Sequence, residues 1–192
     1  MSDSETLASV CRLLSQGSAD SAGALLGREM PFQPVAPVTR KCTQRQALGV
    51  FRRDGFLCRY SGERLIFPGT LRLLSVLWPE QFPYHTNWKM GETHLAYWRL
   101  YPTVDHVVPV ARGGPDDTTN WVTTSQLRNS AKSNWLLGEL GWTLRPAGDL
   151  RDWDGLSGWF LEYVEAHPDL LKVPAIKHWY RDLRGANLES SA

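Results

Sequence analysis

The sequence predicts an α+β fold in which a small strand–loop–strand–helix core carries helical N- and C-terminal extensions and an aromatic-rich insertion. An apolar run over residues 103–110, a Gly-Gly loop and a second short apolar segment indicate the two strands. Residues 153–167 repeat apolar side chains at helical intervals, whereas residues 66–102 are aromatic-rich without a regular period. The 192 residues, 42% hydrophobic and 21% charged, suffice for one globular domain with appendages.

The N-terminal part, residues 1–40, is expected to be an arm. Its helices are predicted over residues 4–15 and 19–27, and the three prolines of residues 31–38 predict an extended linker. The start of the chain lacks a basic segment followed by a long apolar run, so we expect no signal peptide. No apolar stretch approaches the roughly 18 residues of a membrane-spanning helix. Three scattered cysteines fit a reducing cytoplasm, and we expect a cytoplasmic protein.

Residues 41–138 are the expected core, with an insertion at 62–104. Thr43 is the predicted N-cap of a helix over residues 43–55, and Gly55 the residue that ends it. A turn or short hairpin follows around Ser61 and Gly62. The remaining predicted elements are an irregular segment, a strand, a loop, a short return strand and a helix, over residues 66–102, 103–110, 111–120, 121–123 and 124–134.

Residues 139–192 are the expected helical extension, packed on the core. Residues 153–167 predict one helix. Residues 168–184 predict a last helix or a pair of helices, because Pro174 interrupts the pattern.

Polar residues in the predicted core have a spacing that packing alone does not require. His106 is a plausible general base because an imidazole titrates near neutral pH. Asp105 and Asn129 offer the hard oxygen ligands that suit Mg²⁺ or Mn²⁺. Neighbouring strand residues point to opposite faces, so Asp105 and His106 can share a site only if the strand ends there. The glycines at 113 and 114 would give the following turn its freedom. Metal-assisted phosphodiester hydrolysis needs such groups.

These residues resemble the HNH endonuclease family, whose core is the ββα-metal fold. The matching segments are "DHVVPVARGG", "NWV" and "RNSAK", at residues 105–114, 120–122 and 128–132. Upstream, "FRRDGFLCRYSG" (51–62) is similar to the segment that precedes the Asp-His strand in the family. The resemblance covers residues 43–65 and 103–135, and it does not extend to the arm, the aromatic insertion or the tail.

The resemblance implies a role for each residue of the motif. Asp105 and Asn129 would hold one divalent metal ion, Mg²⁺ or Mn²⁺. His106 would activate the water, and Asn120 would orient His106 or pin the loop, completing the catalytic set. Each of these polar residues also has a plain structural interpretation, because Asp and Asn favour caps and turns.

The sequence departs from the family at the structural zinc site. Many members carry two Cys-x-x-Cys pairs, whereas here the segments read "CRYS" (58–61) and "SQLR" (125–128). A tetrahedral zinc site needs four ligands, so we predict no structural zinc. Apolar packing by residues 62–104, with Trp121 and Trp135, is expected to hold the core together instead.

Other residues leave alternatives open. The net charge of +1 gives no overall basic signature, so nucleic-acid contacts must come from local groups. The candidates are Arg112, Arg128, Lys132, Lys177 and Arg181, each of which is otherwise a solvated surface charge. His85 and His94 could form a metal site with Cys58. The aromatic side chains of the insertion could form a core or stack on single-stranded bases.

The sequence therefore predicts a metal-dependent HNH endonuclease that acts on double-stranded DNA and leaves 5′-phosphate and 3′-hydroxyl ends as the family implies. One such site cuts one strand, so a double-strand break requires a homodimer or two nicks. Two alternatives stay open: a nucleic-acid-binding module that does not cleave, and a toxin-like nuclease or RNase. No membrane partner is expected.

Overall fold

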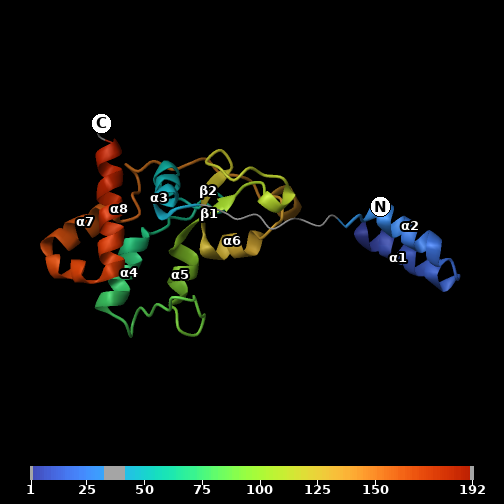
Figure 1. Cartoon of the computed structure of the whole chain (residues 1–192), viewed down its shortest axis with the longest axis horizontal. Helices are drawn as coiled ribbons and strands as arrows, with labels where there is room; N and C mark the ends of the chain where they lie inside the picture. The colour runs from blue at the N-terminus through green and yellow to red at the C-terminus, as the bar shows by residue number, and fades with distance from the viewer. Residues whose placement is uncertain (1, 33–41, 191–192) are drawn as a thin grey trace. The chain divides into compact units, whose positions relative to one another are not determined.

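The computed structural model describes residues 2–32 and 42–190 (Figure 1). The protein combines helices with one small antiparallel sheet, an α+β architecture. The chain divides into two compact units, Met1–Pro37 and Val38–Ala192. No helix within the described residues is long and apolar enough to cross a membrane.

The first unit is a helical hairpin of α1 (Asp3–Ser15) and α2 (Ala19–Glu29). Ser2 and Glu5 form a capping box that satisfies free N–H groups at the start of α1. Val10 and Ala22 are buried in this unit. Both predicted helices are confirmed. The predicted linker lies, from residue 33 onward, outside the described residues.

The second unit begins with α3 (Gln44–Arg53), and Thr43 is its N-cap as predicted. Asp54, which is fully buried, follows this helix and accepts a hydrogen bond of 2.7 Å from the backbone N–H of Thr123. The guanidinium of Arg59 pairs with the same carboxylate at 2.9 Å, and the backbone N–H of Arg59 donates to the carbonyl of Thr123. Because a buried charge is stable only when it is paired, this contact fixes α3 against the sheet.

The prediction of an irregular segment over residues 66–102 is wrong. The segment contains α4 (Pro68–Leu77) and α5 (Leu95–Leu100). Pro68 occupies the first turn of α4, where a missing N–H costs nothing, and Leu71 and Leu73 of this helix are buried. Tyr97 of α5 is also fully buried and lies among several other aromatic rings. Tertiary packing stabilises helices here that show little local periodicity.

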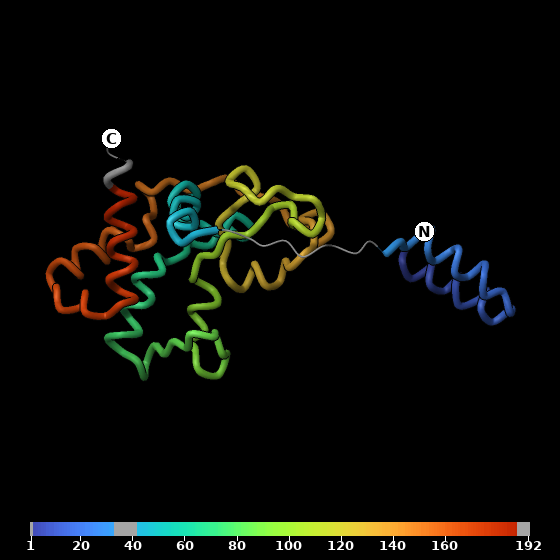
Figure 2. The backbone as a smooth tube through the Cα atoms, viewed as in Figure 1, coloured from blue at the N-terminus to red at the C-terminus, as the bar shows by residue number. Residues whose placement is uncertain are grey.

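The sheet consists of β1 (Pro102–His106) and β2 (Trp121–Ser125), followed directly by α6 (Gln126–Lys132) (Figure 1). Figure 2 traces the same backbone, with the coil of α6 in yellow. The strands pair antiparallel, with Asp105 opposite Val122 and His106 opposite Trp121. The predicted strand over 103–110 is too long, because the chain leaves the sheet after His106 and forms the 3-10 turn Val110–Arg112. Ser125 caps α6 by accepting from the N–H of Arg128.

The main apolar core lies beside this sheet. Its elements are α3, α4, α7 (Ser157–Ala166) and α8 (Pro174–Ser190). A short 3-10 helix, Gly138–Leu140, lies between α6 and α7 in the chain. The 3-10 helix Pro168–Lys172 precedes α8, so the predicted break at Pro174 is confirmed. Aromatic rings fill the centre of the core: Phe51, Phe56, Phe67, Phe160 and Trp179.

Candidate active site

A polar pocket opens where β1 ends and α6 passes beneath it. Its volume is about 260 Å³. The lining residues include Asp105 and His106 from the end of β1 and Asn129 from α6. The remaining lining residues are Pro109, Ser133 and Asn134. The structure therefore brings together three of the four residues predicted to bind the metal or catalyse, although they lie up to 24 positions apart in the chain.

Asp105 is held by two partners that approach the same oxygen. The phenol of Tyr60 donates to Oδ2 at 2.7 Å, and the ammonium of Lys132 lies 3.1 Å from it. Burial, reinforced by the neighbouring Asp105, raises the pKa of Tyr60, so the phenol stays protonated and donates. Within the described residues only Oδ2 of Asp105 has protein partners. Oδ1 therefore remains able to bind a cation.

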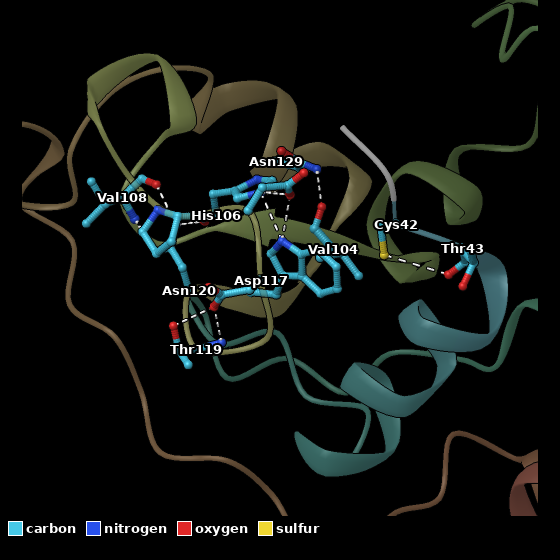
Figure 3. A network of polar contacts seen from close by, with 12 residues as sticks. Cys42, Thr43, Val104, His106, Val108, Asp117, Thr119, Asn120 and Asn129 are labelled. Atoms are coloured by element: carbon cyan, nitrogen blue, oxygen red, sulfur yellow. Dashed lines mark hydrogen bonds and ion pairs between the residues drawn. The ribbon is translucent and has the colours of Figure 1, made fainter. Parts of the chain in front are cut away.

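Asn129 is oriented by its amide nitrogen. Nδ2 donates to the hydroxyl of Thr103 at 3.1 Å and to the carbonyl of Val104 at 3.4 Å. Because the nitrogen is directed at β1, the oxygen of the amide is the atom left to face the pocket. Figure 3 shows Asn129 and His106 at neighbouring positions above β1.

His106 is held by its Nε2 atom. This nitrogen lies 2.7 Å from Oδ1 of Asp116 and 3.0 Å from Nε1 of Trp121. The imidazole and the indole meet edge to face, with 6.3 Å between ring centroids. Nδ1 has no protein partner within the described part of the chain, so it is the ring nitrogen left for a water in the pocket.

Asn120 pins the loop between the strands. Its Oδ1 accepts from the N–H of Val108 at 2.9 Å, and its Nδ2 donates to the carbonyls of Val108 and Pro115 at 2.8 and 2.9 Å (Figure 3). The side chain makes no hydrogen bond to His106, so of the two roles considered for it the loop-pinning one matches its contacts.

The two glycines of this loop meet different requirements. Gly113 adopts a φ of +87°, which favours glycine. Gly114 lies so close to the loop that a Cβ atom would stand 1.9 Å from the carbonyl oxygen of Val108. The loop therefore needs glycine at both positions, as the sequence indicated.

The four positions of the family's cysteine pairs carry other interactions here. Cys58 is buried, and its thiol lies 3.4 Å from the hydroxyl of Thr124. Ser61 bonds to Glu63, Ser125 caps α6, and Arg128 lies over the ring of Trp142 at 5.3 Å. Each position thus has a defined role in local packing.

A small apolar cluster includes Cys58. Tyr60, Leu65 and Val122 are buried in it, and Leu137 and Trp142 pack against them. The prediction that Trp135 contributes is wrong, because 53% of that residue is exposed. Trp142, whose ring centroid lies 5.8 Å from that of Tyr60, takes this place instead.

Lys132 is not the exposed, phosphate-contacting cation that the sequence predicted. Its side chain is fully buried, and its ammonium donates to the carbonyl of His106 at 2.7 Å as well as pairing with Asp105. A group enclosed in this way does not face the surface on which a DNA phosphate would lie. Lys132 is therefore part of the support of the site.

The other predicted phosphate contacts are spread over the surface. Arg112 pairs with Glu139 at 2.8 Å near the pocket loop. Lys177 is exposed on α8, and Arg181 on the same helix pairs with Asp182 at 3.2 Å. The lining of the pocket includes no residue of α8, and Figure 1 shows α8 and α6 on either side of α3.

His85 and His94 do not form a metal site with Cys58. His94 caps α5, its Nδ1 accepting from the N–H of Ala96, and His85 accepts from the N–H of Asn87. The described residues contain no group of three or more His, Cys, Asp or Glu side chains able to hold a metal. The pocket at the end of β1 offers a different donor set, the carboxylate of Asp105 and the amides of Asn129 and Asn134.

Sequence reasoning missed three residues that shape the site. Tyr60 holds Asp105, and Asp116 and Trp121 hold His106. Asp116 lies in a loop rich in turn-forming residues, where an aspartate ordinarily indicates a turn. Only the position of Trp121 opposite His106 could have been anticipated, from the antiparallel pairing.

Comparison with protein-family models, curated proteins and solved structures found no match to this chain. The interpretation of the site therefore rests on its own residues and their geometry.

Proposed function

We propose that β1, β2 and α6 form the ββα-metal core of a metal-dependent HNH endonuclease that hydrolyses DNA phosphodiester bonds. One observation carries the proposal: Asp105, His106 and Asn129 line the same polar pocket. A carboxylate, an imidazole and an amide serve hydrolysis when they converge, and packing gives no reason to gather them.

The donors in the pocket fit one divalent ion. Oδ1 of Asp105 and the amide oxygen of Asn129 are hard oxygen ligands, and Mg²⁺ characteristically combines one or two protein oxygens with waters. Mg²⁺ or Mn²⁺ bound there would neutralise charge on the phosphate and on the leaving oxygen. Tyr60 and Lys132 keep the Asp105 carboxylate in place whether or not the ion is present.

His106 is the proposed general base. Its side chain is only 9% exposed and lines the pocket, so a water bound there lies within reach of Nδ1. Taking a proton from that water generates the attacking hydroxide. Asn120 contributes indirectly, because it fixes the loop that follows His106.

The proposed substrate is double-stranded DNA, and the expected products carry 5′-phosphate and 3′-hydroxyl ends. One pocket cuts one strand at a time. A double-strand break then needs two chains, as in a homodimer, or two successive nicks. Arg112, which is 42% exposed beside the pocket loop, is the predicted cation best placed to contact the DNA backbone.

A second candidate is a nucleic-acid-binding module on this scaffold that does not cleave. It is favoured by the ion pair between Lys132 and Asp105, because the ammonium already neutralises the only carboxylate that lines the pocket. The two candidates differ in a measurable way. Binding alone would be sensitive to salt, with no strand cut at any metal concentration.

The test is nicking of supercoiled plasmid with Mg²⁺ or Mn²⁺. We expect nicking that EDTA abolishes, and a loss of about 100-fold or more in His106→Ala. His178→Ala, which removes an exposed histidine of α8, is the matched control and should cut like the parent chain. An equally active His106→Ala variant would refute the assignment, and metal-independent binding without cutting would favour the binding module. An RNA substrate run in parallel distinguishes an RNase.

A further inference from the structure

Three polar atoms meet on the side of the His106 ring that carries Nε2. Nε2 lies 2.7 Å from Oδ1 of Asp116 and 3.0 Å from Nε1 of Trp121. Nε1 of Trp121 in turn lies 3.0 Å from the same Asp116 oxygen. The triangle involves two nitrogens and one carboxylate oxygen, and the positions of its hydrogens follow from chemistry.

The indole nitrogen carries a hydrogen and only donates, whereas the carboxylate only accepts. If Nε2 of His106 lacked a hydrogen, it would face Oδ1 of Asp116 lone pair to lone pair at 2.7 Å, which is repulsive. If Nε2 carries the hydrogen, it donates to Asp116, and Trp121 donates to the same oxygen. The second arrangement places a hydrogen in each short contact with the oxygen, and in the neutral imidazole it leaves Nδ1 with its lone pair.

Both partners of Nε2 are themselves fixed by the fold. Trp121 is 3% exposed and stands opposite His106 in the sheet, so the register of β1 and β2 sets its distance. Asp116 lies in the loop that Asn120 pins through Val108 and Pro115. A displacement of this loop would therefore move the Asp116 carboxylate away from the imidazole.

We propose that Asp116 is the positioning residue that holds His106 in the Nε2–H tautomer, with Nδ1 presented to the water in the pocket, and that Trp121 positions the Asp116 carboxylate by donating to the same oxygen. Neither residue touches the substrate or the metal in this account. Because the proposal assigns a role in orienting the general base, it rests on the proposed nuclease function. The tautomer itself is a property of the free protein, and it can be measured without any cleavage.

The experiment is nitrogen NMR of the full chain labelled with ¹⁵N-histidine, at about pH 9, where imidazoles are neutral. The signals of His106 are those absent from His106→Ala. We expect the parent chain to show a protonated Nε2 and a bare Nδ1. Asp116→Ala should lose this preference and give a mixture of tautomers or the reverse one.

Asp117→Ala is the matched control in the same loop. Asp117 accepts from the N–H and hydroxyl of Thr119 and makes no contact with the imidazole, so this variant should keep the parent tautomer. A bare Nε2 in the parent chain, or a tautomer that Asp116→Ala leaves unchanged, would overturn the proposal. Trp121→Phe, which keeps a ring but removes the N–H, should shift the tautomer less than Asp116→Ala.

Plasmid nicking supplies the second readout. Asp116→Ala should lower kcat about 100-fold while the KM for plasmid stays unchanged, because the base is misoriented and DNA binding is not affected. An unchanged kcat in a variant with the altered tautomer would also overturn the positioning role. If the parent chain does not nick DNA at all, the tautomer measurement still decides what Asp116 and Trp121 do to the imidazole.

Discussion

Replacing Lys132 by methionine should destabilise the fold strongly. The Lys132 ammonium is fully buried, donates to the carbonyl of His106 at 2.7 Å and pairs with Asp105 at 3.1 Å. Removing one partner of a buried ion pair costs about 3–5 kcal/mol, because the remaining charge stays buried. Methionine keeps most of the side-chain volume, and Tyr60 still donates to Asp105, so we expect a loss of about 3 kcal/mol.

Urea denaturation, followed by tryptophan fluorescence, measures this loss as a change in the free energy of unfolding. Lys177→Met is the matched control, since Lys177 is exposed on α8, and it should change stability by less than about 0.5 kcal/mol. If Lys132→Met matched that control, the buried ammonium would not be supporting the site, and the ion pair with Asp105 would be wrong.

Three further predictions follow from the loop and from the buried aromatic cluster. Asn120→Ala removes three hydrogen bonds of a buried side chain and should lower the free energy of unfolding by about 3 kcal/mol, as measured by urea denaturation. The same variant should nick plasmid at least tenfold more slowly than the parent chain. Gly114→Ala forces a Cβ against the carbonyl of Val108 and should reduce nicking more than Gly113→Ala, whose Cβ meets nothing within 4 Å; comparable activities would contradict the loop geometry. Burial raises the pKa of Tyr97 to about 12, whereas an unfolded tyrosine ionises at about 10. The contribution of Tyr97 to stability is therefore complete below about pH 10 and falls by roughly 3 kcal/mol as the pH rises to 12; a stability curve that stays flat across this range would contradict it.

The core around the site could be predicted because its signals are local. The apolar run over residues 103–110 and the glycines of the loop each indicate one element by its own chemistry, although the strand ends earlier, at His106. Thr43 and Pro174 mark boundaries in the same way, and the structure has both where they were expected. These residues determine the backbone close to themselves in sequence.

The remaining features depend on contacts between distant residues. Helices α4 and α5 form because their apolar side chains pack in cores that local periodicity does not reveal. Tyr60 reaches Asp105 across 45 positions of sequence, and Trp142, rather than Trp135, covers Tyr60. Lys132 has the spacing of an exposed helical lysine, and only the fold places its ammonium against Asp105.

We propose that Asp105 and Asn129 hold one divalent ion beside His106. A crystal structure with Mn²⁺, using the anomalous signal of manganese, tests it most directly. The account predicts a single ion in the pocket, at about 2.1 Å from Oδ1 of Asp105 and from the amide oxygen of Asn129. A pocket without manganese at saturating concentration, or an ion bound by other residues, would contradict it.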